Sequence, residues 1–317
     1  MENKLRVIQE EIDELYRLTP RHIDGVIYGS MTTWPHPVGV KTFMKFIHVN
    51  GNDPVTFKIV AEYERKLINE VGSLIGATTG MHTSGGTESN ILAVWIAKRL
   101  SRGKVVLAPS TVHKSIDKAC LLMDLKLVKI PVNPLSPVDP SIIENYVFEY
   151  KPFIVIITAG TTETGVIDPV KEVAELASKH GFYLHVDAAY GGLLIPFLRR
   201  HGLVQEDLYM FNGVSSITID MHKVGMAPIP SSILFVKDNE FLESACFEMD
   251  YMPIGKSCGL LGTRPGAAVI SSYYTWRATG VENYERNALK MLSLAKKHYP
   301  LLFLDLRYID QINYWKY

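Results

Sequence analysis

The chain has 317 residues, of which 47% are hydrophobic and 21% are charged, so it can bury the core of one large or two modest domains. Its 33 basic and 33 acidic residues cancel, and this balance indicates neither a nucleic acid nor an anionic membrane as partner. The three cysteines, Cys120, Cys246 and Cys258, form no CxxC pair and are odd in number. They predict a reducing compartment and argue against a disulfide framework or a zinc site.

The N-terminal segment predicts an amphipathic helix, because apolar residues recur at helical spacing with charged residues between them. The apolar residues are Leu5, Ile8, Ile12 and Leu15. We expect a surface or interface helix, since the segment is too charged for a signal peptide and too amphipathic for a membrane span. Residues 24–57 are rich in glycine, proline and aromatic residues, which predicts a loop. The longest apolar run, residues 153–159, is too short to cross a membrane, so we expect a soluble cytoplasmic protein.

From about residue 70 onward, short apolar runs alternate with helical patterns. The predicted strands cover residues 104–108, 125–132, 153–158, 182–187, 216–219 and 232–236. The predicted helices cover residues 112–123, 140–150, 170–180 and 281–298. This alternation predicts an α/β fold with a mostly parallel sheet that helices cover on both faces. Ligands of such sheets bind beyond the carboxyl ends of the strands, where the polar clusters of this sequence fall.

The first polar cluster, MHTSGGTESN, spans residues 81–90 and precedes an apolar helical run. Gly85 and Gly86 permit close backbone approach, and Thr87 is a candidate cap for the helix. The free N–H groups of a helix N-terminus form an anion site, which favours phosphate binding here. The motif is neither a Walker loop nor GxGxxG, and a plain glycine-containing helix start is the alternative.

The second and third clusters carry an acid and an amine. In HVDAAYGG, Asp187 ends an apolar strand, where a carboxylate needs a partner such as a protonated ring nitrogen, and Ala189 leaves flat space beside it. A structural aspartate that caps the next turn is the alternative. In TIDMHK, Lys223 follows a strand; a desolvated lysine can form an imine, whereas an ordinary lysine lies on the surface.

His113 follows the first predicted strand, and its imidazole could stack on a planar ligand or serve a structural purpose. Considered together, the clusters supply a phosphate cradle, a carboxylate, an aromatic stacker and a lysine at the strand ends of one sheet. Pyridoxal phosphate (PLP) needs these four groups. The sequence therefore predicts a PLP site.

These motifs occur in an order that resembles the group II PLP-dependent decarboxylases of fold type I. The resemblance covers roughly residues 25–290 and is closest to the archaeal L-tyrosine/L-aspartate decarboxylases. It is carried by SMTTWPHP, NDP, TSGGTESN, HKS, GTTETG, HVDAAYGG, DMHK and GTRPGAA. It implies a PLP-binding large domain with a mostly parallel seven-stranded sheet. We expect an N-terminal helix and interface segment over residues 1–50, the large domain over 51–280, and a long helix with a shortened C-terminal small domain over 281–317.

The resemblance also implies a role for each site residue. Lys223 would hold the cofactor through an imine, Asp187 would pair with the pyridine nitrogen, and the ring would lie between His113 and Ala189. The implied phosphate ligands are Gly86, Thr87 and His222, with Thr263 reaching the phosphate of the partner subunit in a homodimer. Thr161 or Thr162 would lie near the cofactor's ring oxygen or the substrate carboxylate.

Three further residues have implied roles, and each also has a purely structural alternative. Arg264 is a candidate to bind the substrate carboxylate through both nitrogens, or else a structural ion pair. Tyr251 corresponds to the tyrosine that protonates Cα in related enzymes, or else is a surface tyrosine. His36 would help to line an aromatic substrate pocket with Trp34 and Tyr28, or else pack an interface.

The leading hypothesis is decarboxylation of an L-amino acid, tyrosine or aspartate, to its amine and CO2. A PLP-dependent carbon–carbon lyase of the sphingosine-phosphate lyase type is the first alternative, although it needs further basic residues that the sequence does not reveal. A desulfurase would need a nucleophilic cysteine, for which Cys258 is the candidate. An inactive, truncated subunit is the non-enzymatic alternative, since only about 20 residues follow the predicted long helix.

Overall fold

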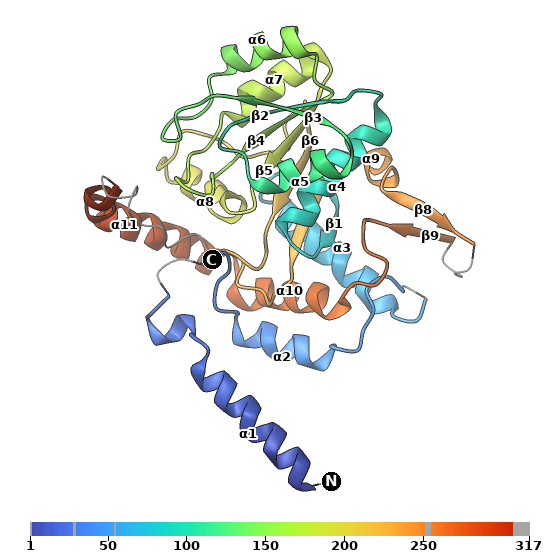
Figure 1. Cartoon of the computed structure of the whole chain (residues 1–317), viewed down its shortest axis with the longest axis vertical. Coiled ribbons are helices and arrows are strands. Elements are labelled where there is room, and N and C mark those ends of the chain that lie inside the picture. The colour runs from blue at the N-terminus through green and yellow to red at the C-terminus, as the bar shows by residue number, and fades with distance from the viewer. Residues whose placement is uncertain (1, 28–29, 54, 251–254, 307–317) are drawn as a thin grey trace.

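A seven-stranded sheet forms the centre of the chain, as seen in the computed structural model, which describes residues 2–27, 30–53, 55–250 and 255–306 (Figure 1). The strands are β1 (Thr79–Thr83), β2 (Val105–Pro109), β3 (Lys126–Ile130), β4 (Ile154–Thr158), β5 (Tyr183–Asp187), β6 (Val214–Ile219) and β7 (Ser232–Val236). Their order is β1-β7-β6-β5-β4-β2-β3, and β7 runs antiparallel to β6 and β1 while the other pairs are parallel. The predicted α/β fold with a mostly parallel sheet is confirmed.

Eleven α-helices lie in the described part of the chain. They are α1 (Glu2–Leu18), α2 (Pro37–Lys45), α3 (Lys58–Gly72), α4 (Gly86–Leu100), α5 (Lys114–Leu122), α6 (Pro140–Tyr150), α7 (Val170–His180), α8 (Ile195–Arg200), α9 (Asn239–Glu243), α10 (Gly266–Thr279) and α11 (Val281–Leu306). Two short 3-10 helices, His22–Asp24 and Gly191–Leu193, complete them. No helix of the described residues combines the length and the apolar character that a membrane crossing requires.

Alternate residues of each central strand pack on opposite faces of the sheet, as the two-residue period of a strand requires. In β4, Val155 and Ile157 join the core cluster that α6, α7 and α8 cover. Ile154 and Ile156 point the other way, into the cluster that α4 and α5 cover. Helix α1 extends away from this core (Figure 1), and its apolar side chains are exposed. The two covered faces leave the carboxyl ends of the strands as the place where polar side chains can gather.

The prediction of a loop over residues 24–57 was wrong for α2. Pro37 occupies the first turn of this helix, where its fixed backbone angle favours a helix and its missing N–H group is not needed. His36 precedes it, and its Nδ1 atom accepts a hydrogen bond from the Val38 backbone N–H at 3.2 Å. Buried Gly39 then lets α2 lie close against α10. The proline and glycine that suggested a loop are therefore the residues that start and pack the helix.

The expectation that the cysteines form no disulfide was also wrong. Cys246 and Cys258 are bonded across a two-stranded hairpin of β8 (Cys246–Met249) and β9 (Gly255–Cys258). The two residues pair directly in the antiparallel register, which brings their Cα atoms to 3.9 Å although they are 12 residues apart. A spacing of this length carries no motif, so the sequence could not reveal the pairing. Cys258 consequently offers no free thiol of the kind that a desulfurase needs.

Replacing Gly39 by alanine should destabilise the fold by about 1–3 kcal/mol, the usual cost of overpacking. A Cβ atom at this position would overlap the Thr275 hydroxyl and lie 2.9 Å from Pro228 Cδ. Urea unfolding of Gly39→Ala measures the change. Val40→Ala is the matched control, because Val40 is exposed on the same helix and its truncation should change the free energy of unfolding far less. Equal stability of the two variants would contradict the packing described here.

Candidate active site

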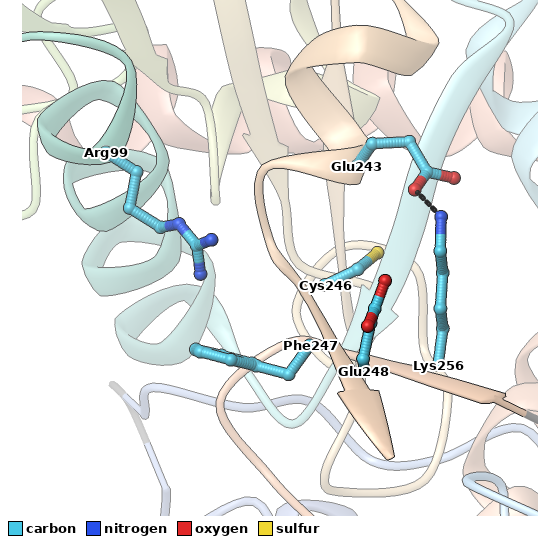
Figure 2. A pocket seen from close by; sticks show the side chains of 6 residues that line it. All are labelled: Arg99, Glu243, Cys246, Phe247, Glu248 and Lys256. Carbon is cyan, nitrogen blue, oxygen red and sulfur yellow. Dashed lines mark hydrogen bonds and ion pairs between the residues drawn. The ribbon is translucent and has the colours of Figure 1, made fainter. Parts of the chain in front are cut away.

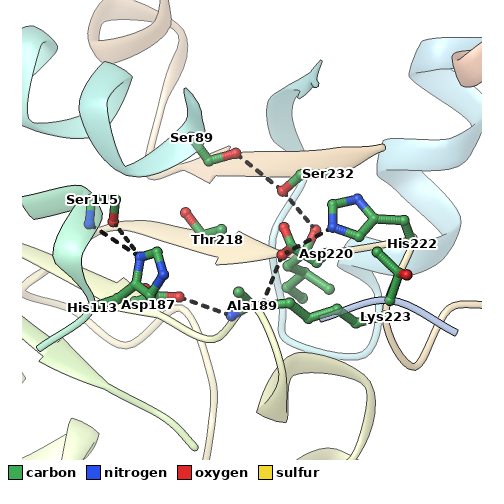
Figure 3. Close-up of polar contacts among 12 residues, drawn as sticks. Ser89, His113, Ser115, Asp187, Ala189, Thr218, Asp220, His222, Lys223 and Ser232 are labelled. Atoms are coloured by element: carbon green, nitrogen blue, oxygen red, sulfur yellow. Dashed lines mark hydrogen bonds and ion pairs between the residues drawn. The ribbon is translucent and has the colours of Figure 1, made fainter. Parts of the chain in front are cut away.

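Polar side chains gather where β5 and β6 end and where α4 and α5 begin. Figure 3 shows His113, Asp187, Ala189, Asp220, His222 and Lys223 along this edge of the sheet. Asp187 is the last residue of β5, and Asp220 follows directly on β6. The topology therefore brings together residues from four separate parts of the sequence.

The N-terminus of α4 has the form of a phosphate cradle. Gly85 precedes the helix with φ of 151°, a backbone conformation that residues with a side chain rarely adopt. A Cβ atom on Gly86 would lie 3.0 Å from both carboxylate oxygens of Asp220 and 3.3 Å from Ala189 Cβ, so a side chain here would crowd both neighbours. Thr87 lies in the first turn and is not the helix cap that the sequence suggested, because Gly85 occupies that position. The first N–H groups of a helix have no acceptor within it and suit an anion.

Lys223 lies beside this cradle on the loop after β6. Its Nζ atom is 3.0 Å from Asp220 Oδ2, and His222 Nε2 is 3.6 Å from the same oxygen. Burial lowers the pKa of His222, and the negative charge of Asp220 partly offsets this effect. Among the described residues, Asp220 Oδ1 is one of the buried side-chain oxygens without a hydrogen-bond partner.

Asp187 is held by two hydrogen bonds. Its Oδ1 accepts from the Ala189 backbone N–H at 3.0 Å, and its Oδ2 accepts from Asn90 Nδ2 at 2.7 Å. The Ala189 carbonyl in turn accepts from the Asp220 N–H at 3.2 Å. A short chain of contacts therefore links the buried acid at the end of β5 to the lysine loop at the end of β6.

His113 precedes α5 and is oriented by that helix. Its Nδ1 atom accepts from the Ser115 backbone N–H at 3.2 Å and lies 2.9 Å from Ser115 Oγ. Ser115 Oγ also accepts from Asn90 Nδ2 at 2.8 Å. The predicted stacking imidazole and the predicted ring-nitrogen acid thus share one supporting residue, Asn90.

The remaining predicted residues lie around this centre or apart from it. Thr161 is buried after β4, and its hydroxyl is used within its own turn by Thr164 and by the Val166 N–H. Thr263 is exposed on the chain described here. Tyr251 and Tyr28 lie outside the described residues. Their proposed roles, like those of the central residues, stay predictions.

Arg264 does not have the surroundings that a substrate-binding arginine needs. Its two terminal nitrogens each lie 2.8 Å from an oxygen of Glu64, and Nη1 also donates to the His82 carbonyl at 2.9 Å. Burial pushes the pKa of Glu64 upward, but the charge and hydrogen bonds of Arg264 outweigh it and leave this pKa below its usual range. The geometry supports the structural ion pair rather than the predicted grip on a substrate carboxylate.

Sequence reasoning missed two residues whose contacts shape the site, Asn90 and Thr33. Asn90 stood inside the quoted TSGGTESN motif without a role; its spacing of one helical turn from Gly86 was the available signal. Thr33 clamps the lysine loop, because its Oγ1 donates to the Lys223 carbonyl at 2.6 Å and its N–H to the His222 carbonyl at 3.3 Å. Next to it, the His36 N–H donates to the Met226 carbonyl at 2.8 Å. No local pattern could reveal these contacts, which span about 190 residues.

A separate pocket of about 330 Å³ lies beside the disulfide hairpin (Figure 2). Its lining residues are Arg99, Glu243, Cys246, Phe247, Glu248 and Lys256. Glu243 and Lys256 form an ion pair of 2.7 Å, and the Arg99 guanidinium lies 4.9 Å from the centre of the Phe247 ring. None of the predicted site residues that the structure describes lines this pocket, which sets it apart from the candidate active site.

The residues at the sheet edge fit the needs of PLP: backbone N–H donors for a phosphate, a buried carboxylate, an imidazole and a nearby amine. The model of the pyridoxal-dependent decarboxylase conserved domain matches residues 58–308 of this chain. The chain belongs to this family. It is therefore a PLP-dependent amino-acid decarboxylase, and the predicted family, cofactor and enzyme class are confirmed.

Curated relatives agree with this assignment. A probable L-tyrosine/L-aspartate decarboxylase of Methanosphaera stadtmanae is 33% identical over 300 residues, which cover 92% of this chain and 77% of the relative. One of Methanopyrus kandleri is 35% identical over 305 residues, which cover 92% of this chain and 82% of the relative. Among solved structures, a sphingosine-1-phosphate lyase of Burkholderia pseudomallei superposes with a TM-score of 0.81 at 24% identity, over 90% of this chain and 70% of that one. A glutamate decarboxylase of Lactobacillus brevis superposes with a TM-score of 0.73 at 20% identity, over 90% of this chain and 71% of that one. At these identities the two structures support the fold alone.

Replacing Glu64 by glutamine should lower the free energy of unfolding by about 3–5 kcal/mol, because it leaves the Arg264 charge buried and uncompensated. Chemical unfolding of Glu64→Gln measures the loss. Glu62→Gln is the matched control, since Glu62 forms an exposed pair with Lys66 on the same helix. If Glu64→Gln instead kept full stability and raised only the KM of the substrate, Arg264 would have to be counted as a substrate ligand.

Acid should destabilise the protein partly through His82, which lies behind the lysine loop with Nε2 2.9 Å from Ser231 Oγ. Burial lowers the pKa of His82 to about 3, so the unfolded chain binds a proton here more readily than the folded chain below about pH 6.5. Stability from this group is thus present at neutral pH and falls as the pH falls toward 3. His82→Gln should reduce the stability lost between pH 7 and pH 5 by about 2 kcal/mol. His48→Gln, at an exposed position, serves as control. If both variants lost as much stability between pH 7 and pH 5 as the wild type, the burial argument would be contradicted.

Proposed function

We propose that this protein decarboxylates L-tyrosine or L-aspartate at Cα as a homodimer. The observation that carries the proposal is the placement of the Lys223 amine beside the Gly86 cradle, with Asp187 linked to the same loop through Ala189. The two amino acids are those for which the archaeal relatives are named, and two of these relatives are at least 33% identical to the chain over 92% of its length. Exposed Thr263 and the exposed apolar side chains of α1 support a dimer, because both are available to a second copy.

Each residue of the site has one task in this proposal. Bound PLP supplies an electron sink for the pair that CO2 leaves on Cα. Lys223 supplies the amine that binds the cofactor aldehyde, and Gly86, Thr87 and His222 hold the phosphate. Asp187 keeps a proton at the ring nitrogen, because an adjacent carboxylate favours the cationic form.

The other residues orient the ring and the substrate. His113 and Ala189 hold the ring between them, and Thr161 lies near the ring oxygen or the substrate carboxylate. Tyr251 is the proposed donor of the proton to Cα. His36 and Trp34 belong to a segment that contacts the loop after Lys223, which supports a place for them next to the substrate side chain.

Lys223→Ala should abolish amine and CO2 release, since no other amine reaches the cofactor from that loop. The experiment incubates the purified chain and PLP with a panel of L-amino acids and measures both products. Borohydride reduction followed by peptide mapping should label Lys223 in the wild type and nothing at that position in the variant. Lys237→Ala is the control, because Lys237 lies on the surface at the far end of β7 and should not affect turnover.

The same assay separates the alternatives. An aldehyde released from a phosphorylated amino alcohol without CO2 would indicate the carbon–carbon lyase instead. A wild-type chain that folds, takes up PLP and releases no product from any amino acid would favour the inactive subunit. The buried Arg264–Glu64 pair argues against the lyase, because it leaves one fewer cation for a substrate phosphate.

A further inference from the structure

We propose that Asn90 is the positioning residue that holds Asp187 and His113 in the geometry the cofactor ring requires. This inference rests on the proposed function, because it concerns the acid and the imidazole assigned there to the ring. It adds a residue on a different element, α4, to the machinery of the site.

Asn90 is almost completely buried and makes every hydrogen bond that its side chain allows. It is 1% exposed. Its Nδ2 donates to Asp187 Oδ2 at 2.7 Å and to Ser115 Oγ at 2.8 Å. Its Oδ1 accepts from His185 Nε2 at 2.9 Å and from Thr218 Oγ1 at 3.0 Å. An asparagine amide has two donors and two acceptor positions, so the group is saturated.

The orientation of the amide follows from its partners. The Asp187 carboxylate can only accept, and the Thr218 hydroxyl donates from the opposite side. A flipped amide would place Oδ1 against the carboxylate, where two acceptors would repel each other. Since buried polar groups must be paired, the environment selects one orientation and Asn90 presents an N–H to Asp187.

His185 supports the same orientation from the middle of the sheet. Burial lowers the pKa of this histidine to about 4, and the nearby charge of Asp187 only partly opposes that effect, so the ring is neutral at pH 7. Its Nε2 must carry the hydrogen that it shares with Asn90 Oδ1, and its Nδ1 then accepts from Ser216 Oγ at 2.8 Å. A neutral histidine in this tautomer completes the network without adding a positive charge that would compete with the cofactor's ring nitrogen for Asp187.

The network reaches His113 through Ser115. Ser115 Oγ accepts from Asn90, so its own hydrogen is available to His113 Nδ1, which also accepts from the Ser115 backbone N–H. Both contacts hold the Nδ1 atom of His113 against the start of α5. One buried amide therefore sets the ring-nitrogen acid and the stacking imidazole at the same time.

The test compares Asn90→Leu with the wild type. Leucine has a similar volume but makes no hydrogen bond, so Asp187 loses a donor and can reorient. The dissociation constant for PLP should rise about 10- to 100-fold, as for the loss of comparable supporting contacts. The absorption spectrum of the bound cofactor should change, because ring-nitrogen protonation is less favoured. In turnover, kcat should fall by a similar factor while KM changes little.

Thr218 provides a milder pair of variants that does not depend on Asn90→Leu folding. Thr218→Val removes the hydroxyl that donates to Asn90 Oδ1, whereas Thr218→Ser keeps it. PLP affinity should fall several-fold in the valine variant and stay within about twofold of the wild type in the serine variant. Thermal unfolding of both variants separates a loss of cofactor geometry from a loss of stability.

Two results would overturn the inference. One is a folded Asn90→Leu protein with the PLP affinity and cofactor spectrum of the wild type; the other is a Thr218→Val protein that loses stability alone. A wild-type chain that takes up no PLP would overturn the proposed function, and this inference with it. Failure of this inference is distinguishable from failure of the proposed function. The two variant results leave PLP binding and activity of the wild type unchanged, whereas the third result concerns the wild type itself.

Discussion

Helix α4 serves two parts of the site, because Gly86 opens it and Asn90 lies one turn further along. The helix rises about 1.5 Å per residue, so these residues are separated by about 6 Å along its axis. The first turn carries the proposed phosphate cradle, and the next carries the amide that supports Asp187. A single rigid element thus relates the phosphate end of the proposed cofactor site to its ring-nitrogen end.

That arrangement requires polar groups deep in the core, which is costly unless every group is paired. The cost is limited here because the buried side chains around Asn90 form a connected network at the middle of the sheet. Its members are Asn90, Ser115, His185, Asp187, Ser216 and Thr218. A network of this kind favours one arrangement of the core over alternatives, since any shift leaves a donor or acceptor unpaired.

Local patterns were enough to predict every strand of the sheet except β1, but not the details of the site. The apolar runs around Ile154–Thr158 and Tyr183–Asp187 identify strands on their own. A strand that helices cover on both faces buries all of its side chains, so it is apolar along nearly its whole length. Strand β1 escaped prediction because TGMHT is neither apolar nor alternating and is held by its antiparallel partner β7. The Cys246–Cys258 bond escaped it for a similar reason, since the pairing depends on a hairpin register.

The pairing of Arg264 with Glu64 has a consequence for the chemistry. In a decarboxylation the substrate carboxylate loses its charge as CO2 departs, so a strong ion pair to it stabilises the ground state more than the transition state. An arginine already neutralised by Glu64 exerts no such hold. The buried pair instead ties α3 to the backbone of His82 and to the segment before α10. The geometry therefore assigns this buried cation to the scaffold rather than to the substrate.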